Sequence, residues 1–175
     1  MRHKSYAADA NSLAGRLAVW LASGLGIGFV TPAPGTIGGL WGLALVPAVD
    51  KAPNLEVQVA IVVALLLATV AICDLAARAL GTADDPQPIV LDEIIVLPIV
   101  FLAGPPLTWR VLLAGFLLFR LFDVWKPGLA REAEKLPGGW GIVADDAVAA
   151  ALAWGALHIV LWLDGAAGVG WLAAA

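Results

Sequence analysis

Charged side chains are scarce in this sequence. They make up 14% of the 175 residues, whereas 61% are hydrophobic and the mean hydropathy is +0.91. A soluble domain usually has about a quarter of its residues charged, so the shortage argues against an ordinary water-soluble fold and indicates contact with lipid. Lys and Arg number 10 against 14 Asp and Glu, which leaves no basic patch to neutralise a nucleic-acid backbone. We therefore expect membrane lipids, and not nucleic acid, as partners.

Cysteine and histidine are also nearly absent. The single cysteine, Cys73, excludes an intrachain disulfide and lies in an aliphatic run without a polar phosphate-binding loop. The two histidines, His3 and His158, are isolated from each other and from other polar motifs. Nucleophilic catalysis by sulfur or imidazole is therefore not expected, which favours metal-assisted attack by water.

Long apolar runs take the place of the missing charges. A membrane-spanning helix needs about 20 mostly apolar residues, and residues 55–73 and 147–163 fit this requirement best. Residues 94–103 and 107–122 are further candidates. They are joined at Gly104-Pro105-Pro106, which breaks a continuous helix and predicts a helical hairpin.

The N-terminal third contains shorter apolar runs, residues 17–30 and 37–49, separated by a segment rich in Pro and Gly. This pattern predicts a broken or re-entrant helix pair, in which the second run crosses the membrane and the first is interfacial or partly inserted. No internal repeat or linker is visible, so we expect one domain over residues 1–175. The predicted fold class is all-α: an integral-membrane helical bundle with about four to five membrane-inserted helices.

The positions of Lys and Arg predict the orientation of the chain. If the N-terminus is cytoplasmic, the cations before the first crossing, Arg78, and those between residues 122 and 147 all lie on the cytoplasmic side. The intervening loops carry few positive charges and lie outside. The predicted localisation is therefore a membrane, crossed several times.

Five carboxylates stand at ends of predicted spans that emerge on the cytoplasmic side. They are Asp92, Glu93, Asp123, Asp145 and Asp146. Carboxylates near lipid are costly, and they usually mark ion sites, proton paths or catalysis. An oxygen-rich cluster suits Mg²⁺, which binds a few carboxylates and keeps waters or phosphate oxygens. The sequence therefore predicts a magnesium site, in which one member of each adjacent pair is a ligand and the other a supporting group or general base.

A second motif places charges of both signs near the end of a predicted span. Arg120, Asp123 and Lys126 recur every three residues before Pro127, which predicts one helix face. Arg can hold phosphate oxygens through two N–H groups and Lys as a point charge, so the motif favours phosphate binding. A local ladder of ion pairs at the head-group level is the alternative.

Glycines gather in residues 24–39, which include Gly35 and Thr36. The segment lacks the Gly-Lys-Ser/Thr of a Walker loop. Backbone N–H groups at a helix start could approach a phosphate here. Close helix packing through small residues explains the glycines equally well.

Three segments together resemble the phosphatidylglycerophosphatase A family, in their order and spacing. They are residues 34–38, the Asp85-Pro86 pair with residues 89–93, and residues 119–127 continuing to 138–146. The resemblance covers about residues 24–153. It implies magnesium-dependent removal of the terminal phosphate of phosphatidylglycerophosphate, giving phosphatidylglycerol, at a cytoplasm-facing site of the bacterial inner membrane.

The same resemblance implies roles for individual residues. As catalytic residues it marks Asp92, Glu93, Asp123, Lys126, Asp145 and Asp146, and as substrate-binding residues Arg120, Lys126, Gly35, Thr36 and Asp85. The chain departs from the family pattern at Val96, Gly39, Val143 and the pair Leu129-Ala130, without losing a charged group. The main alternative function is a small cation transporter or channel. Transport sites lie near the membrane midplane, whereas these carboxylates lie at span ends, which favours the enzyme.

Overall fold

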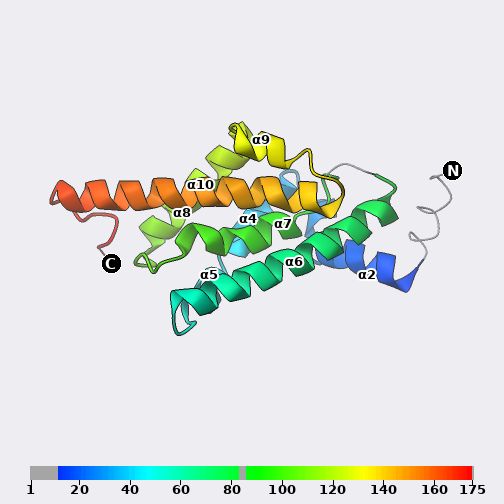
Figure 1. Ribbon diagram of the computed structural model, residues 1–175, viewed down its shortest axis with the longest axis horizontal. Helices are drawn as coiled ribbons and strands as arrows, with labels where there is room; N and C mark the ends of the chain where they lie inside the picture. Colours follow the sequence, from blue (N-terminus) through cyan, green and yellow to red (C-terminus); the bar gives the residue numbers. More distant parts are fainter. Residues whose placement is uncertain (1–11, 83–85, 175) are drawn as a thin grey trace.

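The computed structural model describes residues 12–82 and 86–174, which form helices and loops with no strand among them (Figure 1). The helices in chain order are α2 (Leu13–Ala22), α3 (Ile27–Val30), α4 (Pro34–Gly42), α5 (Val46–Asp50), α6 (Leu55–Leu80), α7 (Leu91–Val96), the 3₁₀ helix η1 (Leu97–Phe101), α8 (Trp109–Trp125), α9 (Leu129–Ala133) and α10 (Gly139–Ala166). The predicted all-α class is confirmed.

Two of the described helices, α6 and α10, are long and apolar enough to cross a membrane. With 26 and 28 residues, they extend about 39 and 42 Å at a rise of 1.5 Å per residue. The Asn54 side chain caps α6 by accepting a hydrogen bond from the Val57 N–H at 2.9 Å. Both helices contain the runs predicted to span, 55–73 and 147–163, and continue beyond them.

The predicted total of four to five membrane-inserted helices is not confirmed. The run 37–49 is divided between α4 and α5, and Pro47 in α5 has no N–H to continue a helix from the preceding turn. The run 94–103 is likewise divided, between α7 and η1, at a point close to Pro98. At 17 residues, α8 is shorter than the roughly 20 residues that a crossing takes. The N-terminal region is broken, as predicted, into α2, α3, α4 and α5.

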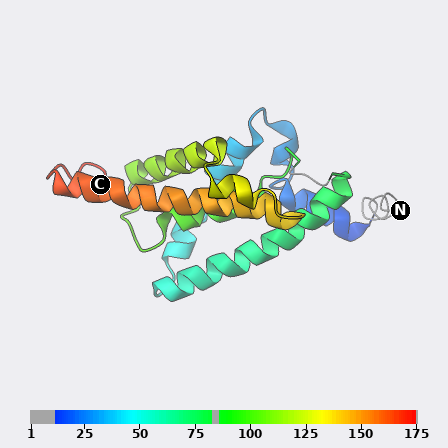
Figure 2. The same cartoon turned by 45° about the horizontal axis from the view of Figure 1, so that its top comes forward.

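The core has two parts. One is formed by η1, α8 and α10, with Leu97, Phe119 and Leu157 fully buried. In the other, α2 lies along the second half of α6, where small residues such as Ala22 and Ala76 let the two backbones approach closely. Figure 2 shows α8 and α10 side by side, in agreement with their contacts. Helix α10, which carries Asp145 and Asp146, packs directly against α7 and α8, which carry the other charges of the predicted site.

A glycine face joins α4 to α7. Glycines at 35, 38, 39 and 42 lie on one side of α4, because residues three and four apart share a helix face. A methyl group at Gly42 would come within 2.7 Å of the Ile94 carbonyl oxygen, and one at Gly38 within 2.9 Å of the Val90 side chain. The close-packing interpretation of the glycine segment is therefore confirmed for α4.

Candidate active site

Helix α10 contributes Asp145 and Asp146. Both are 5% exposed. They lie about two turns inside the helix, and not at its start, because α10 begins at Gly139 and not near Ala147. Neighbouring residues of a helix point about 100° apart, yet both side chains are buried, because α6, α7, α8 and α9 all contact α10. Among the described residues, the Asp145 Oδ1 atom is buried without a hydrogen-bond partner.

Lys126 is the cation closest to this pair. Its Nζ lies 2.7 Å from Asp145 Oδ2 and 3.2 Å from Glu134 Oε1. Burial lowers the pKa of Lys126, but hydrogen bonds and charge attraction from Asp145 and Glu134 outweigh it, so the pKa lies above the usual lysine value. Lys126 therefore keeps its positive charge at neutral pH.

The backbone of Lys126 corrects one prediction. Helix α8 ends at Trp125, and Lys126 is its C-cap in the left-handed conformation, with φ 46° and ψ 62°. It therefore does not continue a helix face with Arg120 and Asp123. The left-handed turn instead directs the side chain to α10 and to the end of α9, where Asp145 and Glu134 lie.

Arg120 links α8 to α7. Its Nη1 lies 2.8 Å from Glu93 Oε2 and 2.7 Å from Asp123 Oδ2. These side chains are mostly buried, with 12–21% of each exposed. Neither contact uses the Nε or Nη2 groups of the guanidinium. Arg120 thus holds two predicted metal ligands together, and it has further N–H groups with which to meet a phosphate.

Asp146 and Asp92 complete the cluster. Asp92, in the first turn of α7, is 3% exposed. The Asp146 carboxylate lies close enough to Asp92, Asp123, Asp145 and Glu93 to experience the negative charge of each. The structure therefore brings together the five carboxylates at which the sequence pointed. Their roles as ligands or bases stay predictions.

The start of α4 reaches the same cluster. A methyl group added to Gly35 would collide with the Glu93 carboxylate, and Thr36 follows in the first turn of α4. Backbone N–H groups in a first helical turn have no partner one turn earlier, so they can meet an anion. Their contact with phosphate remains a prediction. Asp85, also predicted to bind substrate, lies outside the described residues.

The donor atoms suit magnesium, although the site is not a closed cage. Within residues 12–82 and 86–174, no three His, Cys, Asp or Glu side chains are grouped tightly enough to enclose an ion. Mg²⁺ requires only one or two carboxylates, and waters and substrate phosphate oxygens complete its octahedron. The buried Asp145 Oδ1 has no hydrogen-bond partner and is therefore an oxygen atom that could serve as a metal ligand. An open magnesium site therefore fits these residues.

Two residues near the site were not found from the sequence. Glu134 contacts Lys126 although seven residues, including a Pro-Gly turn, lie between them, a spacing without periodic signal. Asp74 Oδ1 accepts a hydrogen bond from the Gly139 N–H at 3.2 Å and so caps α10 from a different helix. Its spacing from Arg78, with which it forms a 2.7 Å ion pair, resembles an ordinary helix-surface pair.

Two apolar helices are long enough to span a bilayer, and beside them Lys126 and Arg120 hold carboxylates that are largely shielded from water, which is an arrangement expected of a membrane protein with a polar functional site. The chain belongs to the phosphatidylglycerophosphatase A family, whose model matches residues 20–161. It is therefore a lipid phosphatase, and the predicted family is confirmed.

Individual relatives agree with this assignment. The chain is 37% identical to phosphatidylglycerophosphatase A of Haemophilus influenzae over 131 residues, which cover 74% of this chain and 80% of the relative. It is 33% identical to phosphatidylglycerophosphatase A of Escherichia coli K12 over 145 residues, or 80% and 81% of the two chains. A Bacteroides thetaiotaomicron relative, provisionally named phosphatidylinositol-3-phosphatase, is 32% identical over 85% of this chain and 96% of its own. No solved structure matches the chain.

Proposed function

We propose that this protein hydrolyses the terminal phosphate monoester of phosphatidylglycerophosphate, giving phosphatidylglycerol and inorganic phosphate in glycerophospholipid biosynthesis. Two relatives that share most of the chain carry the name of this activity. The observation that carries the proposal is the pair of partly buried cations, Arg120 and Lys126, each paired with a carboxylate from another helix. The alternative of a cation transporter or channel finds no support in the comparisons.

Hydrolysis requires water to attack phosphorus while the bond from phosphorus to the glycerol oxygen breaks. One carboxylate of the Asp145–Asp146 pair would accept the proton that the water loses, and the leaving glycerol oxygen would take up a proton from solvent. Lys126 and Arg120 stabilise the charge that spreads over the other phosphate oxygens. Fixed charges of this kind act strongly here because the side chains are largely shielded from water.

Magnesium is part of the proposal. Asp92, Glu93, Asp123, Asp145 and Asp146 would hold it, since they provide the oxygen ligands that it prefers. When bound, Mg²⁺ would add positive charge beside the phosphate and lower the repulsion among these carboxylates.

We further propose a multi-pass position in the bacterial inner membrane with the site facing the cytoplasm. The two spanning helices support a membrane position. The orientation is supported by the exposed cations Arg78, in the last turn of α6, and Arg131 and Lys135, which lie between α8 and α10. Positively charged loops are retained on the cytoplasmic side.

The test is phosphate release by purified protein in detergent micelles. We expect release from phosphatidylglycerophosphate with Mg²⁺ and none after chelation of the metal. Phosphatidylinositol 3-phosphate serves as the comparison substrate, because one relative is provisionally named for it. Equal turnover of both lipids would contradict the head-group assignment, and undiminished activity in the chelator would contradict the magnesium assignment.

A further inference from the structure

Lys126 has two carboxylate partners of different character. Asp145 is 6% exposed at the side chain and holds the Lys126 Nζ at 2.7 Å. Glu134 is 50% exposed and lies farther away, at 3.2 Å. Water screens an exposed pair far more than a buried one, so the Glu134 contact is the weaker of the two. A ligand that approaches Lys126 will therefore displace Glu134 before Asp145.

The Glu134 backbone is held in place while its side chain is able to swing. Its N–H donates to the Ala130 carbonyl at 3.1 Å, which fixes it to the end of α9. A methyl group at Gly141 would lie 2.8 Å from the Glu134 carbonyl oxygen, so this connection is packed tightly on α10. Displacement from Lys126 therefore needs only a rotation of the Glu134 side chain into water.

Lipid phosphates differ in how well they can compete with a carboxylate. A phosphate monoester carries about −1.5 to −2 charges at pH 7, because its second pKa is near 6. A phosphodiester, such as the expected product and the surrounding phospholipids, carries one negative charge, the same as Glu134. Only the monoester gains substantially in charge attraction when it replaces Glu134 beside Lys126.

We propose that Glu134 competes with lipid phosphates for contact with Lys126. Phosphodiester lipids are thereby kept out of the site, whereas a phosphate monoester displaces Glu134 and binds. This inference rests on the proposed function. Glu134 lowers the affinity for every lipid phosphate by the same factor. In a membrane composed mainly of phosphodiesters, that factor keeps their occupancy low, and the more highly charged substrate still binds.

The experiment compares Glu134→Gln with Glu132→Gln in mixed micelles, with phosphatidylglycerol added as inhibitor. Glu132 is the matched control: it lies in α9, is 65% exposed, and pairs with Lys135 at 2.6 Å rather than with Lys126. For Glu134→Gln we expect KM and the inhibition constant of phosphatidylglycerol to fall together, by about two- to fivefold, the range for releasing a partly exposed ion pair. The turnover number of Glu134→Gln should stay within about twofold of the wild type. In Glu132→Gln, KM, the inhibition constant and the turnover number should all stay within about twofold of the wild type.

A second comparison shows whether the effect passes through Lys126. In a Lys126→Met background, Glu134→Gln should leave KM unchanged, because no cation remains for which to compete. A lower KM in that background would show general repulsion of anionic lipid and overturn the proposal. So would unchanged constants in the single variant, equal shifts in both glutamine variants, or a lower turnover number at constant KM.

Wild-type protein without phosphatase activity would instead overturn the proposed function, which keeps the two failures distinct. Glu134→Ala, which removes the carboxylate without adding an amide, should reproduce the result of Glu134→Gln if the native fold is retained on gel filtration. Disagreement between these two variants in the direction of the KM shift would also count against the proposal.

Discussion

Lys126 adopts a backbone conformation that a lysine rarely takes. A left-handed residue other than glycine costs roughly 1–2 kcal/mol, and such residues persist where the surroundings hold them and often where they function. Here the side chain is held by Asp145 and Glu134, with its Nζ 2.7 and 3.2 Å from their oxygens. The unusual turn at the end of α8 therefore places a positive charge against α10.

Replacing Lys126 separates phosphate binding from metal binding. Lys126→Met keeps a stem of similar length and deletes the charge, so turnover should fall by about 10² to 10³, the scale for losing one preorganised electrostatic contact. The magnesium concentration for half-maximal activity should stay level or fall, because a nearby cation only repels the metal. Phosphate release at varied Mg²⁺ measures both quantities. Near-normal turnover would favour the ion-pair ladder and remove Lys126 from the active site.

Replacing a buried carboxylate should affect activity and stability in opposite directions. Asp146 lies among four other carboxylates, so Asp146→Asn removes repulsion as well as a candidate ligand. We expect phosphate release to be abolished, as in Asp123→Asn, while the melting temperature of the metal-free Asp146→Asn protein stays level or rises. Thermal unfolding in detergent and phosphate release are the two measurements.

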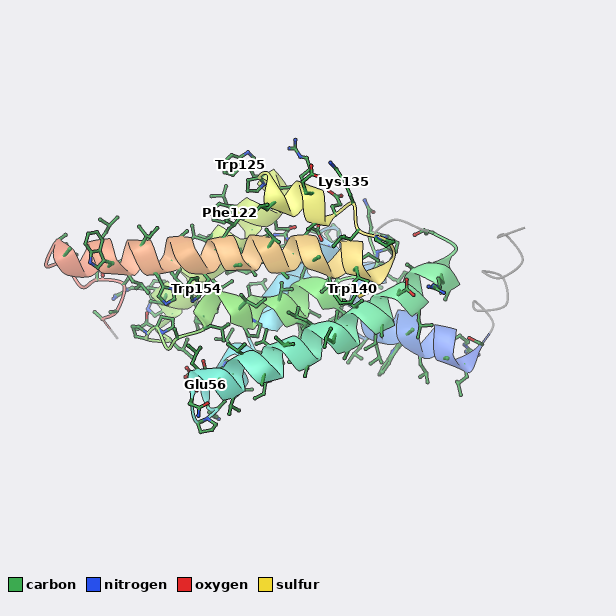
Figure 3. All side chains as sticks on the ribbon, viewed as in Figure 1. Glu56, Phe122, Trp125, Lys135, Trp140 and Trp154 are labelled. Carbon is green, nitrogen blue, oxygen red and sulfur yellow. The ribbon has the colours of Figure 1, made fainter. Side chains whose placement is uncertain are left out.

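The control for these variants is Glu56→Gln. Glu56 is exposed in the first turn of α6, and Figure 3 shows it far from Lys135, which lies between α9 and α10. This substitution should change neither activity nor melting temperature. Wild-type turnover by Asp123→Asn or Asp146→Asn would remove that residue from the site.

At the scale of elements, the meeting of α4 with α7 connects packing to chemistry. On the glycine face of α4, Gly42 lies against the backbone carbonyl of Ile94, whereas Gly35 lies against the Glu93 carboxylate. A clash with backbone must be absorbed by moving a helix, whereas a clash with a carboxylate is relieved by rotating one side chain. Substitutions along this face should therefore have different effects according to their position.

Three alanine substitutions test this difference. Gly42→Ala would clash with the Ile94 carbonyl and should lower the free energy of unfolding by about 1–3 kcal/mol, the usual cost of overpacking. Gly35→Ala should displace the Glu93 carboxylate and lower activity with little change in stability. Gly155→Ala in α10, where a methyl group would meet open space, should leave activity unchanged and stability equal or higher. Equal stability losses at positions 35 and 42 would contradict this distinction.

The element scale also shows what the sequence could and could not predict. The closeness of the carboxylates was predictable, because charges near the ends of apolar runs are expected to gather at a membrane surface, although the number of crossings assumed in that prediction is not confirmed. The breaks in the helices near Pro47 and Pro98 were not predicted, because apolar composition alone does not distinguish one long helix from two short ones. Glu134 and Asp74 act between separate elements, so local spacing carried no signal for either.

For the whole molecule, the proposed topology depends on α6 and α10, because their crossing would determine which surfaces lie on opposite sides of a bilayer. Each is longer than the roughly 30 Å hydrocarbon core, since 26 and 28 residues extend about 39 and 42 Å. Helix α8, at 17 residues or about 26 Å, is slightly short and would need local thinning of the bilayer to cross. Its two ends are therefore the informative places to probe.

Cysteine labelling decides between these arrangements. Cys73 is buried and is first replaced by Ala, and single cysteines are then introduced at Lys135, Pro106 and Lys51, all of which are exposed. Pro106 is preferable to Thr108, because the Thr108 hydroxyl donates to the Leu172 carbonyl at 2.7 Å and accepts from the Val111 N–H. In intact spheroplasts, a membrane-impermeant maleimide should label the cysteines at 106 and 51 but not the one at 135. After permeabilisation, all three should react.

The pattern of labelling distinguishes an error in one helix from an error in the whole topology. If position 106 is protected together with 135 while 51 is labelled, α8 does not cross and only the number of crossings changes. The carboxylates would then still be expected at the membrane face to which Lys135 belongs, because Lys135 lies just before α10, whose first turns carry Asp145 and Asp146. If 135 is labelled and 51 is protected, the chain is inverted and the site faces away from the cytoplasm. That outcome would overturn the proposed substrate access, because a lipid intermediate made at the cytoplasmic face could not reach Lys126 and Asp145 without first crossing the bilayer.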